Sequence, residues 1–396
     1  MNFDDVFRFS AATDVIYGLN SSAEVGREAR RLGATRVFLV TDKGVATSGI
    51  LSVALESLRE SKIPFVLFDK APQDPTDETV DEVACILRAE GCDCVLVAGG
   101  GSALCTGKGA ALMAANDGRI IDYVGVNKYR NKPLPCIAVP TTAGSGSEVS
   151  RITVLTSATT KRKITVAGLT NAPSTAILDP LLLRTVPFGQ ALASGVDALT
   201  HSVEAYISRF SSPITDALAL GAALVIASQL ERAVLTEDIE PKAQMLYASS
   251  MANLACGNAG LGLAHAMNGA ITYLSKVRDY PHVPYGLIHA ITLPLVLEFN
   301  LPSCRAKLAQ LAQAMGFSGQ SPPDSQLLSS HFIEGIKNLL RALRAPTRLP
   351  WDTVSPDDIK EMVAVTLDSP QYLQNPRKCT SDELTELFEK AVKGWR

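Results

Sequence analysis

Two polar side chains in the second half of the chain have the spacing of metal ligands. Asp197 and His201 lie four residues apart in a segment with helical periodicity, so both project from one helix face. His265 stands in a run of small and apolar residues, 258–267, and is a candidate third ligand. Such a group could hold a divalent metal that acts as a Lewis acid. The alternative is a hydrogen-bonded Asp197–His201 pair and an ordinary core histidine at 265.

Two glycine-rich loops in the first half could hold a nucleotide. The predicted strand 94–98 runs into the glycine loop 99–102 and then into a helical pattern, which brings backbone N–H groups close to a phosphate. A second loop, 140–148, follows the strand 136–139 and is rich in hydroxyl and glycine residues. One glycine cluster is often only a tight turn, but two loops after two strands of one sheet predict a dinucleotide site.

Asp42 follows the first predicted strand, 36–41. A carboxylate at this place can accept hydrogen bonds from a ribose hydroxyl and repel a 2′-phosphate, which favours NAD over NADP. The alternative role of Asp42 is to cap the following helix.

The elements that must position these residues follow an alternating pattern in the first half. Predicted strands at 36–41, 65–68, 94–98 and 136–139 alternate with helix-period segments at 47–60, 78–90 and 103–116. This order predicts a parallel sheet with helices on both faces. An extra edge hairpin is expected around 14–17 and an exposed hairpin at 152–166.

The residue pattern changes near residue 186, after which long segments with helical periodicity dominate. We therefore predict an α/β dinucleotide-binding domain at 1–185, with a Rossmann-like parallel sheet, and an all-helical metal and substrate domain at 186–396. Surface loops are expected at 322–324 and 346–357.

Composition excludes several classes of protein. The chain has 396 residues, of which 46% are hydrophobic and 19% charged, and this is typical of a globular protein. A net charge of −3 gives no positive field for nucleic acid. The acidic N-terminal residues do not resemble an export signal, and the most apolar stretches, such as 217–228, are too short to span a membrane. Eight scattered cysteines indicate reduced thiols in a cytoplasmic protein.

These motifs together resemble the iron-containing (group III) alcohol dehydrogenases over nearly the whole chain. The residues that carry the resemblance are VTDKG at 40–44, GGGS at 99–102, PTTAGSGSE at 140–148, Asp197 and His201 followed by SVEAY, NAGLGLAHAM at 258–267, and Asn375-Pro376-Arg377. The resemblance implies a dehydroquinate synthase-like architecture with the active site in the cleft between two domains. It also implies hydride transfer between NAD(H) and a small alcohol, aldehyde or ketone, and a homodimer or larger assembly.

The resemblance assigns roles to individual residues. The implied cofactor contacts are Asp42, Asp74, Gly99, Gly100, Gly101, Ser102, Thr141, Thr142, Ser145 and Lys163. The implied ligands of a divalent metal, Fe²⁺ or Zn²⁺, are Asp197, His201 and His265.

The chain departs from the family at four polar positions. Tyr285 stands where the family has its fourth metal ligand, a histidine in a P-H-G motif, and Gly269 replaces a further family histidine. Cys105 replaces an aspartate although Lys108 is kept, and Asp74 stands where the family usually has asparagine.

These departures leave two mechanisms open. In the first, His282 or Tyr285 completes a metal site with the three implied ligands. In the second, no metal binds, and Tyr285 or His282 polarises the carbonyl as a general acid. The candidate catalytic residues are therefore His265, Tyr285 and His282.

Other functions remain as alternatives. A dehydroquinate-synthase-like lyase would be expected to have several Lys and Arg residues near Asp197 and His265, where the sequence is small and apolar. A non-catalytic NAD-binding relative is a second alternative, against which both cofactor loops are retained. The segment 271–283 is expected to form part of the entrance to the site or a lid, where Lys276 and Arg278 could attract an anionic substrate; the alternative is an ordinary solvated loop.

Overall fold

The structure is a computed structural model and describes residues 6–318 and 325–396. These residues form two compact units, one of Ser10–Pro187 and one of residues 6–9 with Phe188–Arg396. The predicted loop at 322–324 lies outside the described residues.

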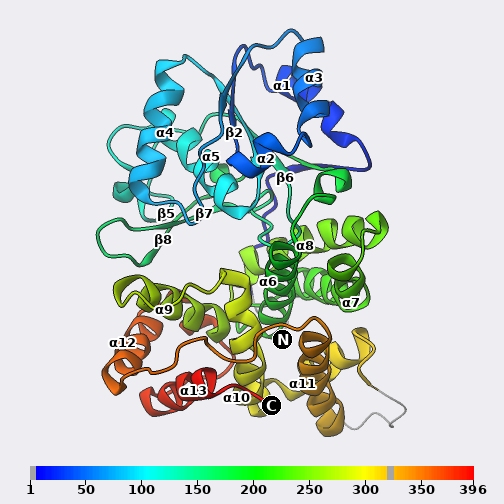
Figure 1. Cartoon of the computed structure of the whole chain (residues 1–396), viewed down its shortest axis with the longest axis vertical. Coiled ribbons are helices and arrows are strands. Elements are labelled where there is room, and N and C mark those ends of the chain that lie inside the picture. The colour runs from blue at the N-terminus through cyan, green and yellow to red at the C-terminus, as the bar shows by residue number, and fades with distance from the viewer. Residues whose placement is uncertain (1–5, 319–324) are drawn as a thin grey trace. The chain divides into compact units, whose positions relative to one another are not determined.

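A six-stranded parallel sheet forms the centre of the α/β unit, as the alternation of strands and helices predicted (Figure 1). Its spatial order is β1-β9-β6-β4-β2-β3, and every pairing between neighbours is parallel. The strands are β1 (Asp14–Tyr17), β2 (Val37–Val40), β3 (Phe65–Phe68), β4 (Cys94–Gly99), β6 (Cys136–Pro140) and β9 (Thr175–Leu178). The central strands β2, β4, β6 and β9 are buried along their whole length, which explains why they read as continuous apolar runs.

Helices pack on both faces of this sheet. They are α1 (Val25–Arg31), α2 (Lys43–Thr47), α3 (Ser52–Glu60), α4 (Asp77–Ala89) and α5 (Gly101–Ala114). Side chains alternate along β2, so Val37 and Leu39 join the hydrophobic core beneath α1 and α3, whereas Phe38 and Val40 join the core beneath α4 and α5. Burial on both faces holds the strand ends, and the loops that follow them, in fixed positions.

The two predicted hairpins have different outcomes. The expected hairpin at 152–166 is present, because β7 (Ile152–Thr156) pairs antiparallel with β8 (Lys163–Ala167), but it is not exposed, since nearly all of its strand residues are buried or half-buried. They form a second sheet with β5 (Gly125–Val126). The expected hairpin around 14–17 is not observed, because β1 pairs in parallel with β9 at the edge of the main sheet.

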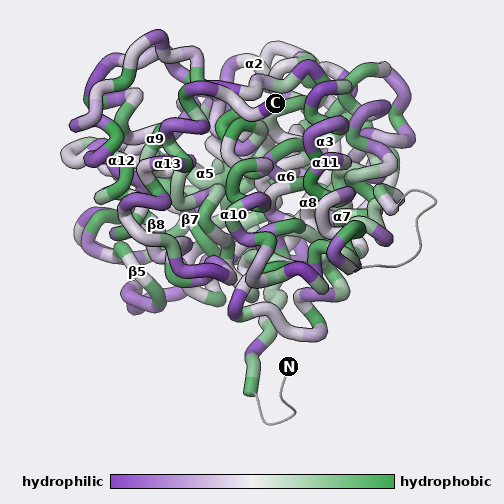
Figure 2. Tube along the Cα trace, turned by 90° about the horizontal axis from the view of Figure 1, so that it is seen from below, coloured by the Kyte–Doolittle hydropathy of each residue, from purple (hydrophilic) through white to green (hydrophobic). Residues whose placement is uncertain are grey.

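The second unit is helical, as predicted. Its helices are α6 (Phe188–Ile207), α7 (Pro213–Leu235), α8 (Ile239–Ala259), α9 (Leu263–Val277), α10 (Tyr285–Ala314), α11 (Ser325–Ala342), α12 (Pro356–Leu367) and α13 (Ser381–Lys393). The long α10 contains two prolines and a non-helical residue, Cys304, at a kink. Figure 2 shows many hydrophobic residues along α10, in agreement with its burial.

Two helices are longer and more apolar than expected. Among the described residues, Pro213–Leu235 and Tyr285–Ala314 meet the length and hydropathy of a membrane span. The apolar run at 217–228 therefore belongs to a helix that is long enough to cross a bilayer. A core helix meets the same requirement, and 67% of the apolar window of α10 and 33% of that of α7 are buried. Length and composition alone thus do not indicate a membrane segment here.

Candidate functional site

Asp197, His201 and His265 come together in the helical unit. Asp197 and His201 project from one face of α6, and His265 projects from the first turn of α9. Their potential ligand atoms all lie within 4.8 Å of one another. Asp197 Oδ1 is 3.8 Å from the Nε2 atoms of both His201 and His265. The i, i+4 spacing therefore places Asp197 and His201 on one face of α6, as predicted, and α9 contributes the third side chain.

Burial and charge at this cluster favour a cation. Asp197 is only 12% exposed, and burial raises the pKa of its carboxyl, but His201, His289 and His265 outweigh burial and hold the pKa below its usual range. Asp197 is thus a carboxylate. Its Oδ1 atom and the Nε2 atom of His265 are buried without a hydrogen-bond partner among the described residues. Two buried, unpartnered electron-pair donors that face one another fit a divalent metal.

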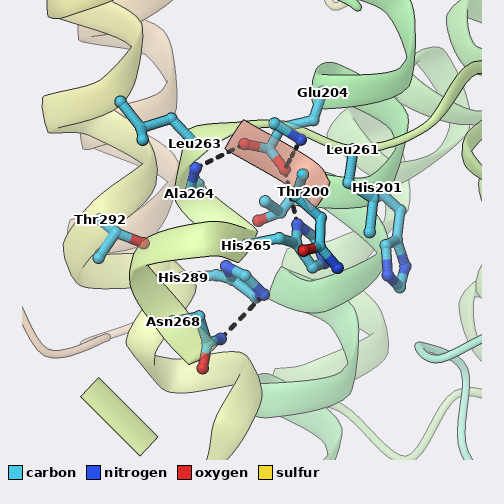
Figure 3. Close-up of polar contacts among 12 residues, drawn as sticks. Thr200, His201, Glu204, Leu261, Leu263, Ala264, His265, Asn268, His289 and Thr292 are labelled. Carbon is cyan, nitrogen blue, oxygen red and sulfur yellow. Dashed lines mark hydrogen bonds and ion pairs between the residues drawn. The ribbon is translucent and has the colours of Figure 1, made fainter. Parts of the chain in front are cut away.

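Glu204 orients His265 and was not predicted from the sequence. Its carboxylate accepts the Nδ1 proton of His265 at 2.6 Å and the backbone N–H groups of Gly262 and Ala264 at 3.0 and 2.7 Å (Figure 3). The pKa of Glu204 is raised by burial, but the hydrogen bond and charge of His265 more than compensate and lower it. Burial in turn lowers the pKa of His265. A neutral His265 with its proton on Nδ1 directs an electron pair from Nε2 toward Asp197.

A third imidazole, also missed by the sequence analysis, lies in the same cluster. His289 on α10 is fully buried, and its Nε2 atom is 3.4 Å from Asp197 Oδ1. The ring centroids of His265 and His289 are 4.1 Å apart. Nothing in the local sequence of α10 distinguishes this histidine from a packed core residue, because its role depends on which helix α10 packs against.

The remaining predicted positions of the metal cluster lie in different surroundings. Tyr285 is the first residue of α10, and its ring centroid is 6.4 Å from that of His265 and 5.3 Å from that of His289. His282 is exposed before α10, and the metal-compatible group found among the described residues does not include it. A Cβ at Gly269 would meet no atom within 4 Å, so the histidine replaced there leaves open space.

In the α/β unit, the predicted cofactor residues gather at the carboxyl ends of three neighbouring strands. Asp42 follows β2, Gly99 ends β4 and Thr141 follows β6, and these strands are adjacent in the sheet. Gly99 and Pro140 are register partners, so the two glycine-rich loops start side by side. The carboxyl end of a parallel sheet is where dinucleotides bind in folds of this kind.

The two loops pack closely because they carry glycine. A Cβ at Gly101 would lie 2.8 Å from the Cβ of Ser145, and a Cβ at Gly99 would lie 2.6 Å from that of Ala103. Gly100 begins α5 without a side-chain cap, which leaves the first N–H groups of this helix able to bind a phosphate. These contacts fit a pyrophosphate over the start of α5.

Asp42 caps the helix that follows it, which was the alternative considered, and it can still accept a hydrogen bond from a ribose. Its Oδ1 atom accepts a hydrogen bond from Val45 N at 3.0 Å and caps α2. Its Oδ2 atom lies on the side of Gly99, 3.7 Å from where a Cβ of that glycine would be. One carboxylate can therefore cap the helix and also face a ribose.

Asp74, Ser102 and Lys163 are also brought together. Asp74 N donates to Ser102 Oγ at 3.1 Å, and the Asp74 carboxylate forms an ion pair with Lys163 of β8. The same carboxylate accepts the hydroxyl proton of Thr156 at 2.7 Å. The aspartate that replaces the family asparagine thus ties the 152–167 hairpin to the start of α5.

Arg278 is not available to attract a substrate in the way suggested by the sequence. Its guanidinium contacts Asp358 at 2.9 Å and Glu361 at 2.6 Å, both on α12. Two carboxylates on one guanidinium neutralise its charge, and the side chain fastens the end of α9 to α12.

Comparison with known proteins agrees with both halves of this description. Residues 12–180 match the family model described as iron-containing alcohol dehydrogenase, and residues 191–392 match the C-terminal model of the Fe-containing alcohol dehydrogenase family. The chain is 37% identical to 1,3-propanediol dehydrogenase of Citrobacter freundii over 95% of this chain and 96% of that protein. It is 32% identical to the NAD-dependent methanol dehydrogenase of Bacillus methanolicus over 95% of this chain and 97% of that protein.

A solved structure of 1,3-propanediol oxidoreductase superposes with a TM-score of 0.92 at 34% identity, covering 98% of this chain and all of the other. These matches confirm the resemblance, the two-part α/β and helical fold, and the prediction of an alcohol dehydrogenase. The chain belongs to the iron-containing alcohol dehydrogenase family.

Proposed function

We propose that this protein is an NAD(H)-dependent oxidoreductase that interconverts a small alcohol and its aldehyde or ketone. The observation that carries the proposal is the buried group of Asp197, His201 and His265, in which Asp197 Oδ1 and His265 Nε2 face one another with no hydrogen-bond partner among the described residues. A divalent metal held there, Fe²⁺ or Zn²⁺, would supply a Lewis acid for the substrate oxygen, and NAD(H) would exchange the hydride. The predicted domains 1–185 and 186–396 would bind cofactor and metal, respectively.

Each group of residues has a separate task in this proposal. The loops 99–102 and 140–148 bind the pyrophosphate, and Asp42 accepts hydrogen bonds from the adenosine ribose. Asp197, His201 and His265 hold the metal, while Glu204 keeps the electron pair of His265 Nε2 free of a proton. Short primary alcohols and diols are the proposed substrates, because the relatives include propanediol and methanol dehydrogenases.

Tyr285 is a better candidate than His282 for a proton-transfer role. Its ring lies 6.4 Å from that of His265 between centroids, whereas His282 is exposed. In a metal-independent reductase, the Tyr285 hydroxyl would donate the proton that the reduced carbonyl oxygen takes up.

Elemental mass spectrometry and turnover test this function together. Protein purified anaerobically with Fe²⁺ and Zn²⁺ present should contain about one metal per chain, the number expected of a single three- or four-ligand site. It should also oxidise NADH with short aldehydes and reduce NAD⁺ with 1,3-propanediol or methanol. Metal-free protein with this activity would move the chemistry to Tyr285. Protein that binds NADH without turning over any of these substrates would indicate a non-catalytic relative.

The setting of the enzyme is also proposed. Seven of the eight free cysteines are buried, which suits a reduced compartment, and we place the protein in the cytoplasm. A homodimer or larger assembly is expected, with no nucleic acid or membrane partner, and light scattering after size-exclusion chromatography would give the assembly size.

A further inference from the structure

We propose that His289 is the fourth protein ligand of the metal and takes the place of the histidine that Tyr285 replaces. The proposal rests on the metal-dependent function above and concerns which side chains complete the site. It predicts a ligand set of one carboxylate and three imidazoles: Asp197, His201, His265 and His289.

Asn268 determines which ring nitrogen of His289 accepts a hydrogen bond. The Asn268 amide nitrogen donates to the backbone carbonyl of Tyr285 at 2.8 Å, and its oxygen accepts the Thr272 hydroxyl proton at 3.1 Å. A carbonyl oxygen only accepts, so this orientation of the amide is required. The same amide nitrogen lies 3.0 Å from His289 Nε2 (Figure 3). Nε2 must therefore be the acceptor, with the ring proton on Nδ1.

His289 Nε2 also faces the carboxylate of Asp197. Asp197 Oδ1 lies 3.4 Å away and has no hydrogen-bond partner among the described residues. His265 Nε2, which Glu204 keeps free of a proton, lies 3.8 Å from the same oxygen. Asp197 Oδ1 and His265 Nε2 thus converge with no proton between them, an arrangement that repels unless a cation lies between them, and His289 Nε2 is a third nitrogen close to the same oxygen.

The distances from Asp197 Oδ1 to the three imidazole nitrogens are close to those between ligands of one metal ion. Zinc or iron bonds of about 2.0–2.1 Å to nitrogen and oxygen place neighbouring ligands of a tetrahedral site about 3.3–3.4 Å apart. The separations from Asp197 Oδ1 are 3.4 Å to His289 and 3.8 Å to His201 and His265. The group whose ligand atoms all lie within 4.8 Å of one another is Asp197, His201 and His265, so the His289 ring would have to move toward an ion held by these three. The electron pair of His289 Nε2 serves one partner at a time, so the metal would displace the Asn268 hydrogen bond.

The proposed ligand lies one helical turn after Tyr285 on α10, and the packing of α10 on α6 explains this position. Tyr285 and His289 are four residues apart and share a helix face. Gly286 brings the start of α10 against α6 so closely that a Cβ there would lie 1.8 Å from the carbonyl oxygen of Ala193. Ala193 is one turn before Asp197 on α6. This backbone contact sets the register of the two helices, and with it His289 faces Asp197.

Metal affinity and X-ray absorption spectroscopy test the proposal on the whole protein loaded with Zn²⁺ or Fe²⁺ alone. The variants are His289→Asn and His289→Gln, which keep a polar side chain in the buried site, and Tyr285→Phe. Thr292→Val is the matched control, because Thr292 is a buried residue of α10 whose hydroxyl bonds to the Ile288 carbonyl at 3.1 Å. Circular dichroism and NADH affinity report whether each variant is folded.

The loss of an outer partner of a ligand already weakens metal binding about 10–100-fold. Both His289 variants should therefore bind the metal about 100-fold or more weakly than the wild-type protein in competition with a chelator. The imidazole count in the absorption spectrum should fall from three to two. Tyr285→Phe and Thr292→Val should keep wild-type affinity and three imidazoles.

Other results would overturn the proposal. If Tyr285→Phe releases the metal and both folded His289 variants retain it, the tyrosine is the fourth ligand. A wild-type spectrum with only two imidazoles would likewise show that His289 does not bind the metal. If the wild-type protein binds no metal, the ligand assignment fails, and NADH oxidation by the same sample then shows whether the proposed redox function stands without it.

Discussion

Glu204 and His265 form a buried carboxylate–imidazole pair whose oxygen and nitrogen atoms are 2.6 Å apart, with side chains 1% and 3% exposed. The two residues are 61 positions apart and belong to α6 and α9. Glu204 also accepts two N–H groups at the start of α9, so one carboxylate fixes both the helix and the ring that the helix carries. Glu204 is therefore a positioning residue for the proposed metal site.

Glu204→Gln should weaken metal binding by about 10–100-fold, the cost usually seen when a partner of a ligating histidine is lost. An amide is a weaker acceptor than a carboxylate, and it can turn its N–H groups toward His265 Nδ1. Chelator competition with Zn²⁺ measures the effect, and Glu231→Gln on the exposed face of α7 is the control. The NADH dissociation constant should stay unchanged. Equal weakening of NADH binding would indicate general loss of structure instead.

The sequence allowed prediction of the parts of the site that local spacing controls. Asp197 and His201 share a face because a helix repeats every 3.6 residues, and the loops 99–102 and 140–148 meet because parallel strands end at one edge. Glu204 and His289 could not be found in this way. Their roles depend on how α6, α9 and α10 pack, which Gly286 and the Asn268–Tyr285 contact determine.

The fold was predictable to a similar degree. Apolar runs identified β2, β3, β4 and β6, and the alternation of residue types indicated the hairpin predicted at 152–166. The parallel pairing of β1 with β9 was missed, because these strands are about 160 residues apart and four-residue runs carry no information about a distant partner. The length of α7 was underestimated because polar residues flank its apolar centre.

Asp42→Asn should allow the enzyme to use NADP(H). The amide can still cap α2 through its oxygen, as Asp42 Oδ1 does toward Val45 N, but it no longer repels a 2′-phosphate. We expect kcat/KM for NADPH to rise about tenfold, which corresponds to about 1.4 kcal/mol. Asp42→Ala removes both the charge and the cap, so a loss of stability in this variant alone would separate the two roles. Unchanged cofactor preference in Asp42→Asn would remove Asp42 from the ribose site.

One thiol should react rapidly in the native protein. Cys85 is exposed, whereas the other seven cysteines are buried, and burial raises the pKa of Cys136, Cys304 and Cys379 to about 12 each. The thiolate is the reactive form, so these buried thiols should stay unmodified near neutral pH. Titration with a chromogenic disulfide should show one fast thiol per chain, and all eight in denaturant. Cys85→Ser should abolish the fast phase, and a second fast thiol in the folded protein would contradict the burial pattern.

Lys108 should be essential for stability although it lies outside the proposed metal site. Its ammonium group is buried and donates to the carbonyls of Ser147, Ser150 and Ile152 at 3.0, 3.0 and 2.8 Å. Lys108→Met fills the same space but leaves three buried acceptors without a donor. Because each such acceptor costs about 1–3 kcal/mol, the free energy of unfolding should fall by about 3 kcal/mol or more.

Urea unfolding measures this change, and Lys161→Met is the control, since Lys161 is exposed and donates to the Ala158 carbonyl at 2.7 Å. Lys108 fastens the chain that directly follows the 140–148 loop, so the KM for NAD⁺ should rise in Lys108→Met and stay constant in Lys161→Met. Equal stability of the two variants would mean that water or a shifted loop replaces the ammonium group. A stability loss with unchanged KM would limit the role of Lys108 to the core of the α/β unit and separate it from the cofactor loop.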